Sequence, residues 1–175
     1  MKIVRFDELK AVPWKNGLGI TRELAVEPPG ASMETFAWRV SIADVDTASP
    51  FSVFPDIDRT IVLLEGAGFT MRLDGEREHG LTTPLAPFAF PGEAKVDVRL
   101  AGGATRDFNL MVRRGVSRAR LEVLQGPGVF DGVKVAYVAE GSGSADGQPI
   151  AAGDSVFDAT TITLAPNSQA IAVLL

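Results

Sequence analysis

The sequence predicts an all-β fold built from many short antiparallel strands. Its 18 glycines and 11 prolines are spread along the 175 residues, and runs of 4–8 residues rich in Val, Ile, Phe, Leu and Thr lie between them. Short strands separated by frequent turn signals are typical of sandwiches and barrels. Helical periodicity is weak, so we expect little more than a short helical turn at residues 44–47, where Asp44 could act as a cap.

The expected strands are recognised by alternation. Residues 68–73 (GFTMRL) and 95–100 (KVDVRL) alternate apolar and polar side chains, which gives each strand one buried and one exposed face. Asp-Gly pairs at 74–75 and 146–147 mark turns between strands. The strands are expected at residues 20–26, 36–42, 59–64, 68–73, 88–90, 95–100, 108–112, 119–124, 134–139, 160–164 and 170–175.

A faint internal repeat suggests two related units. Residues 63–66 (LLEG) and 137–141 (YVAEG) are each followed by alternating strands and an Asp-Gly turn. Two such units would form a duplicated small barrel, although similar strand–Gly–strand patterns also arise in any β-rich chain. We expect a first barrel over residues 1–116 and a second, packed on it, over residues 117–175, with strands exchanged between the barrels in places.

Composition excludes several kinds of site. The chain has no cysteine and a single histidine, His79, so it forms no disulfide, thiolate zinc site or iron–sulfur cluster, and no metal site with two histidines of its own. We expect no metal and no cofactor. His79 lies in the charged stretch 74–80, where we expect an exposed residue without a role.

Charge and hydropathy bear on partners and location. The net charge of −5 comes from residues 121–175, which contain six acidic residues and one basic residue, Lys134. Residues 1–120 carry equal numbers of acidic and basic residues. No basic face for nucleic acid is expected. The sequence shows neither a signal-peptide core nor an apolar stretch long enough to span a bilayer. We therefore expect a cytoplasmic protein that contacts no membrane.

The densest group of polar and aromatic residues lies at residues 12–24. Two nearby glycines permit close backbone approach, and the surrounding side chains could grip a small polar anion. A solvent-exposed loop leading into the strand 20–26 is the alternative. The side chains concerned are Trp14, Lys15, Asn16, Thr21, Arg22 and Glu23.

Two further segments place polar groups on strands. In residues 36–42, alternation puts Arg39 and Ser41 on one face, where they could bind a carboxylate, or where Arg39 could simply meet an acid on an outer face. In residues 105–114, Asp107 and Asn109 share a face. Inside a barrel such a face is costly without partners, so we expect it to meet a ligand or a buried arginine.

The segments resemble the HutD/Ves family in the family's own order. The strings concerned are PWKNGLGITRELA (13–25), FAWRVSIADV (36–45), PFSVFPDIDRTIVLLEGAGFTMRL (50–73), FAFPGEAKV (88–96) and DFNLMVRRG (107–115). The resemblance implies a bicupin, two small jelly-roll barrels in one chain. It also implies a regulatory role in histidine utilisation, with a histidine-degradation intermediate such as N-formyl-glutamate as ligand.

Read together, these residues predict a small-molecule site. A dicarboxylate with an amide needs cations, hydroxyls and amides that converge in a concave site. The expected ligand-binding residues are Trp14, Lys15, Asn16, Thr21, Trp38, Arg39, Ser41, Phe54, Arg59 and Asn109. Glu23, Asp58 and Asp107 are expected behind them, with Asp58 orienting Arg59.

Three hypotheses for function follow. The first is a non-catalytic binding protein for a small anionic carboxylate metabolite. The second is a metal-independent enzyme, with Lys15 as general base or Schiff-base former and Glu23 or Asp107 as acid–base group. The third is a protein–protein interaction module that uses the acidic residues 121–175. The sequence leaves a homodimer open and assigns no catalytic residue.

Overall fold

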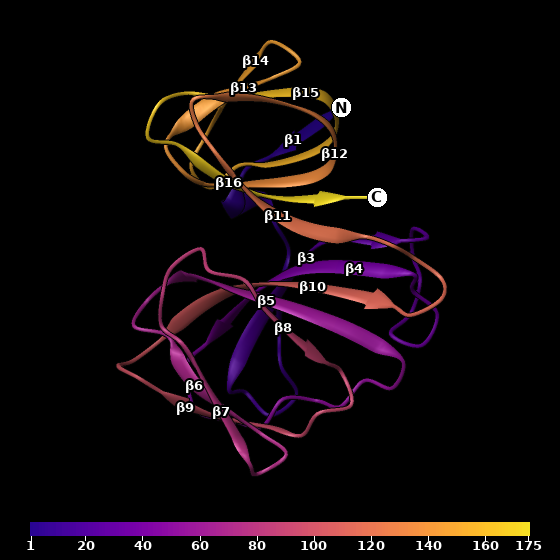
Figure 1. Ribbon diagram of the computed structural model, residues 1–175, viewed down its shortest axis with the longest axis vertical. Coiled ribbons are helices and arrows are strands. Elements are labelled where there is room, and N and C mark those ends of the chain that lie inside the picture. Colours follow the sequence, from indigo (N-terminus) through magenta and orange to yellow (C-terminus); the bar gives the residue numbers. More distant parts are fainter. The chain divides into compact units, whose positions relative to one another are not determined.

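The computed structural model describes all 175 residues as strands, connecting turns and one short 3-10 helix, η1 (Phe6–Glu8) (Figure 1). The prediction of an all-β fold is confirmed, and no helix is long and apolar enough to cross a membrane. The strands are β1 (Lys2–Val4), β2 (Ala11–Pro13), β3 (Gly19–Glu27), β4 (Trp38–Val45), β5 (Ile57–Glu65), β6 (Phe69–Leu73), β7 (Arg77–Leu81), β8 (Phe88–Pro91), β9 (Val96–Leu100), β10 (Thr105–Arg113), β11 (Arg120–Gln125), β12 (Gly128–Glu140), β13 (Ser142–Ala145), β14 (Gln148–Ala151), β15 (Ser155–Leu164) and β16 (Gln169–Leu174).

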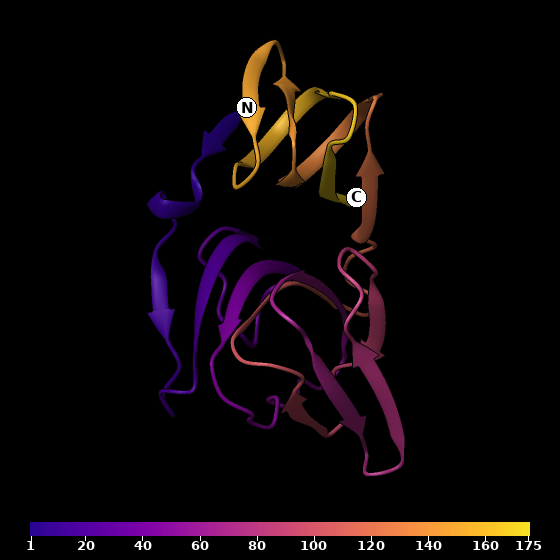
Figure 2. The same cartoon turned by 90° about the vertical axis from the view of Figure 1, so that its left-hand side faces the viewer.

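The chain divides into two compact units. One comprises residues 10–118, and the other combines residues 1–9 with residues 119–175. The first nine residues, which we expected in the segment 1–116, belong to the second unit because β1 pairs antiparallel with β15. Figure 2 shows the indigo N-terminal strand beside the gold strands of that unit.

The larger unit contains two sheets. A six-stranded sheet has the order β2-β3-β4-β10-β5-β8, and a three-stranded sheet has the order β7-β6-β9. Leu63 of the first sheet and Phe69 and Met71 of the second belong to one buried cluster and are fully shielded from solvent. The alternation predicted for residues 68–73 is confirmed, since Arg72 is exposed between the buried residues Met71 and Leu73.

The Asp-Gly pairs form the tight turns that the sequence predicts. Asp74 and Gly75 have φ angles of 53° and 73° between β6 and β7, and Asp146 and Gly147 have φ angles of 45° and 81° between β13 and β14. Two successive positive φ angles match the twist of a two-residue hairpin turn, which is the connection between the paired residues Ala145 and Gln148. Between β6 and β7 the connection is one residue longer, because Leu73 pairs with Arg77.

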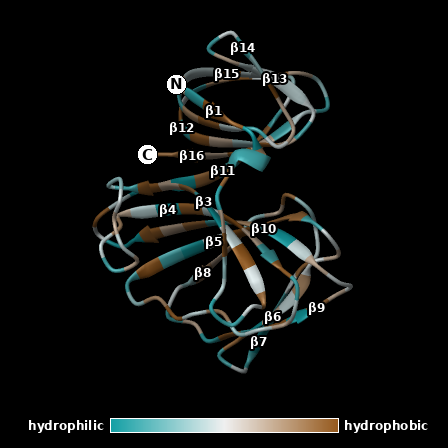
Figure 3. Cartoon of the chain, turned by 180° about the vertical axis from the view of Figure 1, so that it is seen from behind, coloured by the Kyte–Doolittle hydropathy of each residue, from teal (hydrophilic) through white to brown (hydrophobic).

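The smaller unit forms a seven-stranded sheet with the order β11-β16-β12-β15-β13-β14, in which β1 pairs with β15. Its interior is filled by aliphatic side chains such as Val138, Val156 and Ile162. Asp154, 2% exposed, accepts a charge-assisted hydrogen bond from Arg5. Figure 3 shows hydrophobic residues recurring along the strands and hydrophilic ones along many connecting loops.

The prediction of a helical turn at residues 44–47 is wrong. Asp44 lies in β4 instead, where Oδ2 accepts a hydrogen bond from Arg22 Nη1 at 2.6 Å and Oδ1 accepts one from Arg106 Nε at 2.6 Å. These two arginines come from the neighbouring strands β3 and β10, so strand pairing supplies the carboxylate with partners that a local cap would not.

Candidate functional site

Three neighbouring strands of the six-stranded sheet place polar side chains on one face. Asn109 of β10 lies opposite Ser41 of β4, and Met111 lies opposite both Arg39 of β4 and Arg59 of β5. Because successive side chains of a strand alternate between faces, these registers gather the side chains on the same side of the sheet.

A buried chain of hydrogen bonds connects β5 to β10. Arg59 Nη2 donates to Asn109 Oδ1 at 3.1 Å, and Asn109 Nδ2 donates to Asp107 Oδ1. The three side chains are 7%, 6% and 1% exposed. The expectation that the polar face of β10 meets a buried arginine is therefore confirmed, and Asn109 bridges two groups of opposite formal charge.

The Arg59 guanidinium is enclosed by aromatic rings. Its Cζ lies 5.2 Å from the ring centroid of Phe51, 5.5 Å from that of Phe54 and 4.9 Å from that of Phe90. Burial lowers the pKa of Arg59 to about 10, although the neighbouring Asp107 opposes this change. The guanidinium Nε has no hydrogen-bond partner within the protein, which leaves a donor available.

Asp107 is the second unusual group of the site. Its Oδ2 atom is buried and has no hydrogen-bond partner. Burial raises the pKa of Asp107 to about 7, against the opposing effects of Arg59 and of the hydrogen bond from Asn109. A carboxyl group with this pKa exchanges a proton near neutrality.

These side chains open onto a cavity of about 600 Å³ in the larger unit. This volume is within the range of sites for small molecules. The cavity is lined by Pro13, Trp14, Lys15, Asn16, Thr21, Met33, Arg39, Ser41, Ala43, Val45, Pro50, Phe51, Ser52, Phe54, Arg59, Asp107, Asn109 and Met111.

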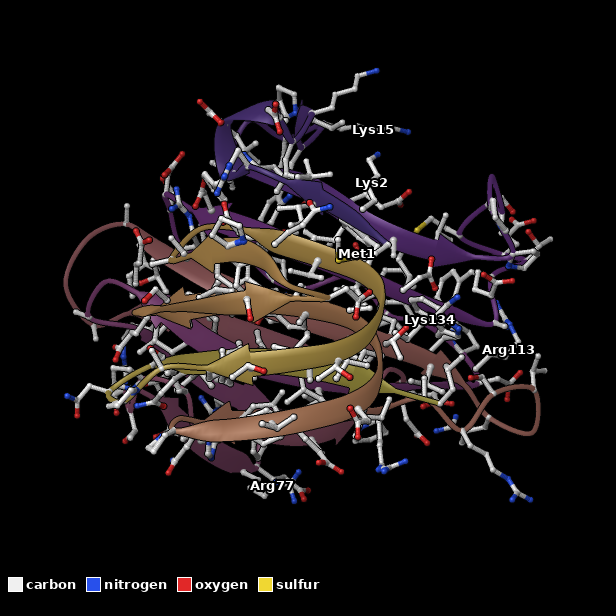
Figure 4. The ribbon with its side chains drawn as sticks, turned by 90° about the horizontal axis from the view of Figure 1, so that it is seen from above. Met1, Lys2, Lys15, Arg77, Arg113 and Lys134 are labelled. Atoms are coloured by element: carbon white, nitrogen blue, oxygen red, sulfur yellow. The ribbon has the colours of Figure 1, made fainter.

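The loop between β2 and β3 forms one wall of the cavity. Trp14 Nε1 donates to Thr21 Oγ1 at 2.8 Å, which fixes the indole against β3. Asn16 Oδ1 accepts a hydrogen bond from the backbone N–H of Leu18 at 3.0 Å, which stabilises the loop. Lys15 is exposed, and Figure 4 shows it on this loop with its side chain extended away from the ribbon.

Arg39 is held in place by an acidic neighbour. Arg39 Nε donates to Glu23 Oε2 at 2.7 Å, and Arg39 Nη1 lies 3.5 Å from Ser41 Oγ. The Glu23 side chain is about half exposed, so the ion pair between Arg39 and Glu23 lies at the solvent-exposed edge of the site. Glu23, which we expected behind the ligand-binding residues, is not among the residues that line the cavity.

The structure brings nine of the ten expected ligand-binding residues to the cavity wall, and Trp38 is the exception. Trp38 is 3% exposed and lies with Val40 and Ile42 on the opposite face of β4 from Arg39. Strand alternation excludes a tryptophan at this position from a site that Arg39 and Ser41 line.

Two other expectations need correction. Asp58 does not orient Arg59: it is exposed, and its Oδ1 accepts a hydrogen bond from Arg114 at 2.8 Å, because adjacent residues of β5 point to opposite faces. His79 is not a solvent-exposed tip residue. It lies within β7, half-buried, with its ring stacked on Phe88 at a centroid distance of 3.6 Å.

Sequence reasoning missed part of the cavity. Phe51 lies three residues before the expected Phe54 and lines the same wall, and Asp107 lines the cavity directly instead of standing behind it. Phe51 shares an apolar segment with Phe54, which is a usable signal. Met33 lies in a connecting segment whose sequence carries no such signal.

No group of three or more His, Asp or Glu side chains is arranged to hold a metal ion. The polar groups of the cavity are cations, amides and hydroxyls, with the single carboxyl of Asp107. Such a set offers hydrogen-bond donors to oxygen atoms of an anion, which is the recognition chemistry of carboxylates.

Comparison with solved structures identifies the fold. HutD from Pseudomonas fluorescens SBW25, solved in a formate condition, and a conserved protein of unknown function from Pseudomonas aeruginosa PAO1 are each 32% identical to this chain. For both, the TM-score is 0.83 over 99% of this chain and 97% of theirs. Ylba from E. coli, a DUF861 protein with 13% identity and a TM-score of 0.73 over 98% of this chain and 88% of its own, shares the fold alone.

Curated relatives agree with the structural neighbours. An uncharacterized 21.2 kDa protein in the hutC 3′ region of Pseudomonas putida is 39% identical over 126 residues, 72% of this chain and 65% of that protein. Protein Ves of Cronobacter sakazakii is 39% identical over 124 residues, 69% of this chain and 66% of its own length. The matched stretch thus spans just under two thirds of each relative. The HutD family model matches residues 7–171, and the chain belongs to the HutD family.

Proposed function

We propose that this protein binds a small carboxylate metabolite without converting it, as part of histidine utilisation. The observation that carries the proposal is the buried Arg59 guanidinium at the cavity, with a free Nε donor. A buried cation is costly unless an anion compensates it. Within the protein Arg59 bonds to the neutral amide of Asn109, and the acidic Asp107 lies beyond that amide, so a bound carboxylate would supply an anion in direct contact with the guanidinium.

Other groups of the cavity suit the same ligand. Arg39 and Ser41 offer donors on the neighbouring strand, and Lys15 adds a cation on the loop. Phe51 and Phe54 provide apolar surface on which an aliphatic chain can pack. A molecule with carboxylate groups separated by a short hydrocarbon chain matches this distribution.

The family gives the metabolic setting. HutD proteins are associated with histidine utilisation, and one relative lies in the hutC 3′ region. Intermediates of histidine degradation that carry carboxylates are therefore the first ligands to test. N-formyl-glutamate has two carboxylates and one formamide, and the cavity offers cations, an amide and hydroxyls to these groups. If the protein binds such an intermediate without converting it, a regulatory role in histidine utilisation follows.

A thermal-shift titration tests the proposal. The protein is titrated with N-formyl-glutamate, formimino-glutamate, urocanate, histidine, glutamate and formate, and each compound is assayed afterwards for chemical change. A ligand at about 100 times its Kd stabilises the folded state by about 2.7 kcal/mol. A selective shift, lost in Arg39→Ala and Arg59→Ala but kept in the control Asp58→Ala, is expected. No shift with any compound would contradict the proposal.

One observation favours a metal-independent enzyme as the second candidate. Asp107 lines the cavity and has a pKa of about 7, which suits a general acid or base. The same assay separates the two functions, because an enzyme would consume the compound that stabilises it. Loss of that turnover in Asp107→Asn, with binding retained, would then assign the catalytic role.

We also infer that each of the two units is one cupin barrel, so that the chain is a bicupin. The larger unit has two hydrogen-bonded sheets and the smaller unit has one, and each unit has its own apolar core. The proposed ligand site belongs to the larger unit alone. Separate expression of residues 10–118 tests this inference: a folded, ligand-binding fragment is expected, and an unfolded one would count against independent barrels.

A further inference from the structure

The two oxygens of the Asp107 carboxyl group have different surroundings. Oδ1 accepts the hydrogen bond from Asn109 Nδ2, whereas Oδ2 is buried without a partner in a residue that lines the cavity. An ionised carboxylate in this position would leave an anionic oxygen buried without a hydrogen bond, which is costly. A protonated Oδ2 instead presents one O–H donor to the cavity.

The charged groups around Asp107 decide which form a bound anion favours. Arg59 faces it from β5, Arg39 and its partner Glu23 lie on the same face of β4 and β3, and Lys15 lies on the loop. Asp44 acts on it from the other face of β4. Only Arg59 is coupled to Asp107 at close range, through Asn109.

We propose that Asp107 binds the anionic ligand as a neutral carboxylic acid, so that each ligand molecule enters the cavity together with one proton. In the free protein the positive charge of Arg59 stabilises ionised Asp107. A carboxylate ligand that bonds to Arg59 neutralises this charge and so weakens that stabilisation. The ligand also brings a negative charge close to Oδ2. Both effects shift Asp107 toward its protonated form, and its O–H then donates to an oxygen of the ligand.

This inference rests on the proposed function and adds a rule of specificity. Near Asp107 the ligand must present an oxygen that accepts a hydrogen bond, from a carboxylate or a carbonyl group. A ligand with an ammonium or amide N–H at that point would instead need ionised Asp107. Its binding would release one proton at a pH where free Asp107 is protonated, and would exchange none where Asp107 is already ionised. The direction of the proton exchange therefore reports which group of the ligand faces Asp107.

The test is calorimetry of the wild-type protein with N-formyl-glutamate in buffers of different ionisation enthalpy. Uptake of about one proton per ligand is expected at pH 8, where free Asp107 is ionised, and almost none at pH 5.5, where it is already protonated. The affinity is expected to fall by about tenfold per pH unit between pH 8 and 9. The carboxylates of N-formyl-glutamate titrate far below this range.

Asp107→Asn is the matched variant, since its amide mimics the neutral acid and keeps an N–H donor at the position of Oδ2. It is expected to bind with an affinity that changes less than about twofold between pH 6 and 9. His79→Gln is the control, because His79 is the single histidine of the chain and does not line the cavity, and it is expected to keep the proton uptake of the wild type.

The outcomes separate the two proposals. Binding of N-formyl-glutamate without proton uptake by the wild type at pH 8 would overturn this inference and leave the proposed function standing. Uptake that persists in Asp107→Asn would assign the proton to another group and also overturn it. Absence of binding at every pH would overturn both. The wild-type calorimetry decides the question even where the variant does not fold.

Discussion

Arg59 Nη2 donates a hydrogen bond to Asn109 Oδ1 at 3.1 Å, which links the neighbouring strands β5 and β10 on the cavity side of the sheet. A buried arginine that bonds to a neutral amide is an unusual arrangement, since buried charges normally pair with opposite charges. The pairing leaves the guanidinium with unused donor capacity, because its Nε bonds to nothing within the protein. The relationship therefore leaves a buried cation at the cavity whose hydrogen-bonding capacity is not fully used within the protein.

Replacing the buried cation separates binding from folding. Arg59→Met keeps an unbranched chain among the aromatic rings but removes the charge and the donors. We expect at least a tenfold loss of affinity for the carboxylate ligand, because the loss removes a charge-assisted hydrogen bond. The free energy of unfolding is expected to stay within about 1 kcal/mol of wild type, since relief from burying a charge offsets the lost bond to Asn109.

Isothermal calorimetry and chemical denaturation of the same preparation measure the two effects. Arg114→Met provides the control, because Arg114 is an arginine of the same unit whose guanidinium lies at the surface against Asp58 and Glu93. It is expected to leave affinity unchanged. Wild-type affinity in Arg59→Met would show that the buried guanidinium has only a structural role.

The protonation of Asp107 predicts how stability depends on pH. Folding raises the pKa of Asp107 from 3.8 to about 7, so the folded state holds this proton more tightly than the unfolded chain does. Its contribution to the free energy of unfolding is therefore most favourable below pH 4, falls as the pH rises from about 4 to 7, and is at its lowest above pH 7.

Asp107→Asn removes this dependence. The variant is expected to match wild type in stability near pH 4 and to exceed it above pH 7, by an amount on the order of 4 kcal/mol if the full change in pKa is realised. Urea denaturation at pH 4, 6 and 8 measures the difference. A variant less stable than wild type at pH 8 would mean that Asp107 is ionised and favourably paired in the folded protein.

The sequence predicts the positions of the strands and much of the cavity, for a common physical reason. Alternation of apolar and polar residues reports which face of a strand is buried, and it correctly separates Arg39 and Ser41 from Val40 and Ile42. The same rule, applied consistently, excludes Trp38 from the site. Trp38 was included because an aromatic ring suits a ligand site, although its position in the strand assigns it to the face opposite Arg39.

What the sequence does not predict depends on contacts between distant strands. Asp58 follows the apolar loop and precedes Arg59, but its partner Arg114 lies 56 positions away. His79 becomes half-buried because β7 brings it against Phe88 of another strand. Pairings of this kind are set by register and packing, which local patterns leave undetermined.

The close packing of Gly19 against Trp14 predicts a variant that deforms the cavity wall. A Cβ atom at Gly19 would lie 2.7 Å from the backbone oxygen of Asp44 and 2.9 Å from the Trp14 ring. Gly19→Ala is therefore expected to displace the indole, to weaken ligand binding and to destabilise the fold by about 1–3 kcal/mol. Gly80→Ala is the control, since its nearest neighbour would lie at 3.6 Å. Equal behaviour of the two variants would show that the wall adapts to the added methyl group.

The two tryptophans predict opposite results when each is replaced by phenylalanine. Trp14 lines the cavity and donates to Thr21, whereas Trp38 is buried on the other face of its strand. Trp14→Phe is expected to weaken ligand binding several-fold with a small loss of stability, because the ring keeps its packing but loses the N–H donor that holds it against β3. Trp38→Phe is expected to lower the free energy of unfolding by about 1–3 kcal/mol and to leave affinity unchanged, because it removes buried volume away from the site.

Fluorescence makes the comparison direct, since the chain holds only these two tryptophans. In Trp38→Phe the remaining emission comes from Trp14 and is expected to change on addition of N-formyl-glutamate. In Trp14→Phe it comes from Trp38 and is expected to stay constant. A ligand-dependent signal from Trp38 alone would place the ligand elsewhere than in this cavity, because an indole buried on the opposite face of β4 has no direct contact with a molecule bound beside Arg39 and Ser41.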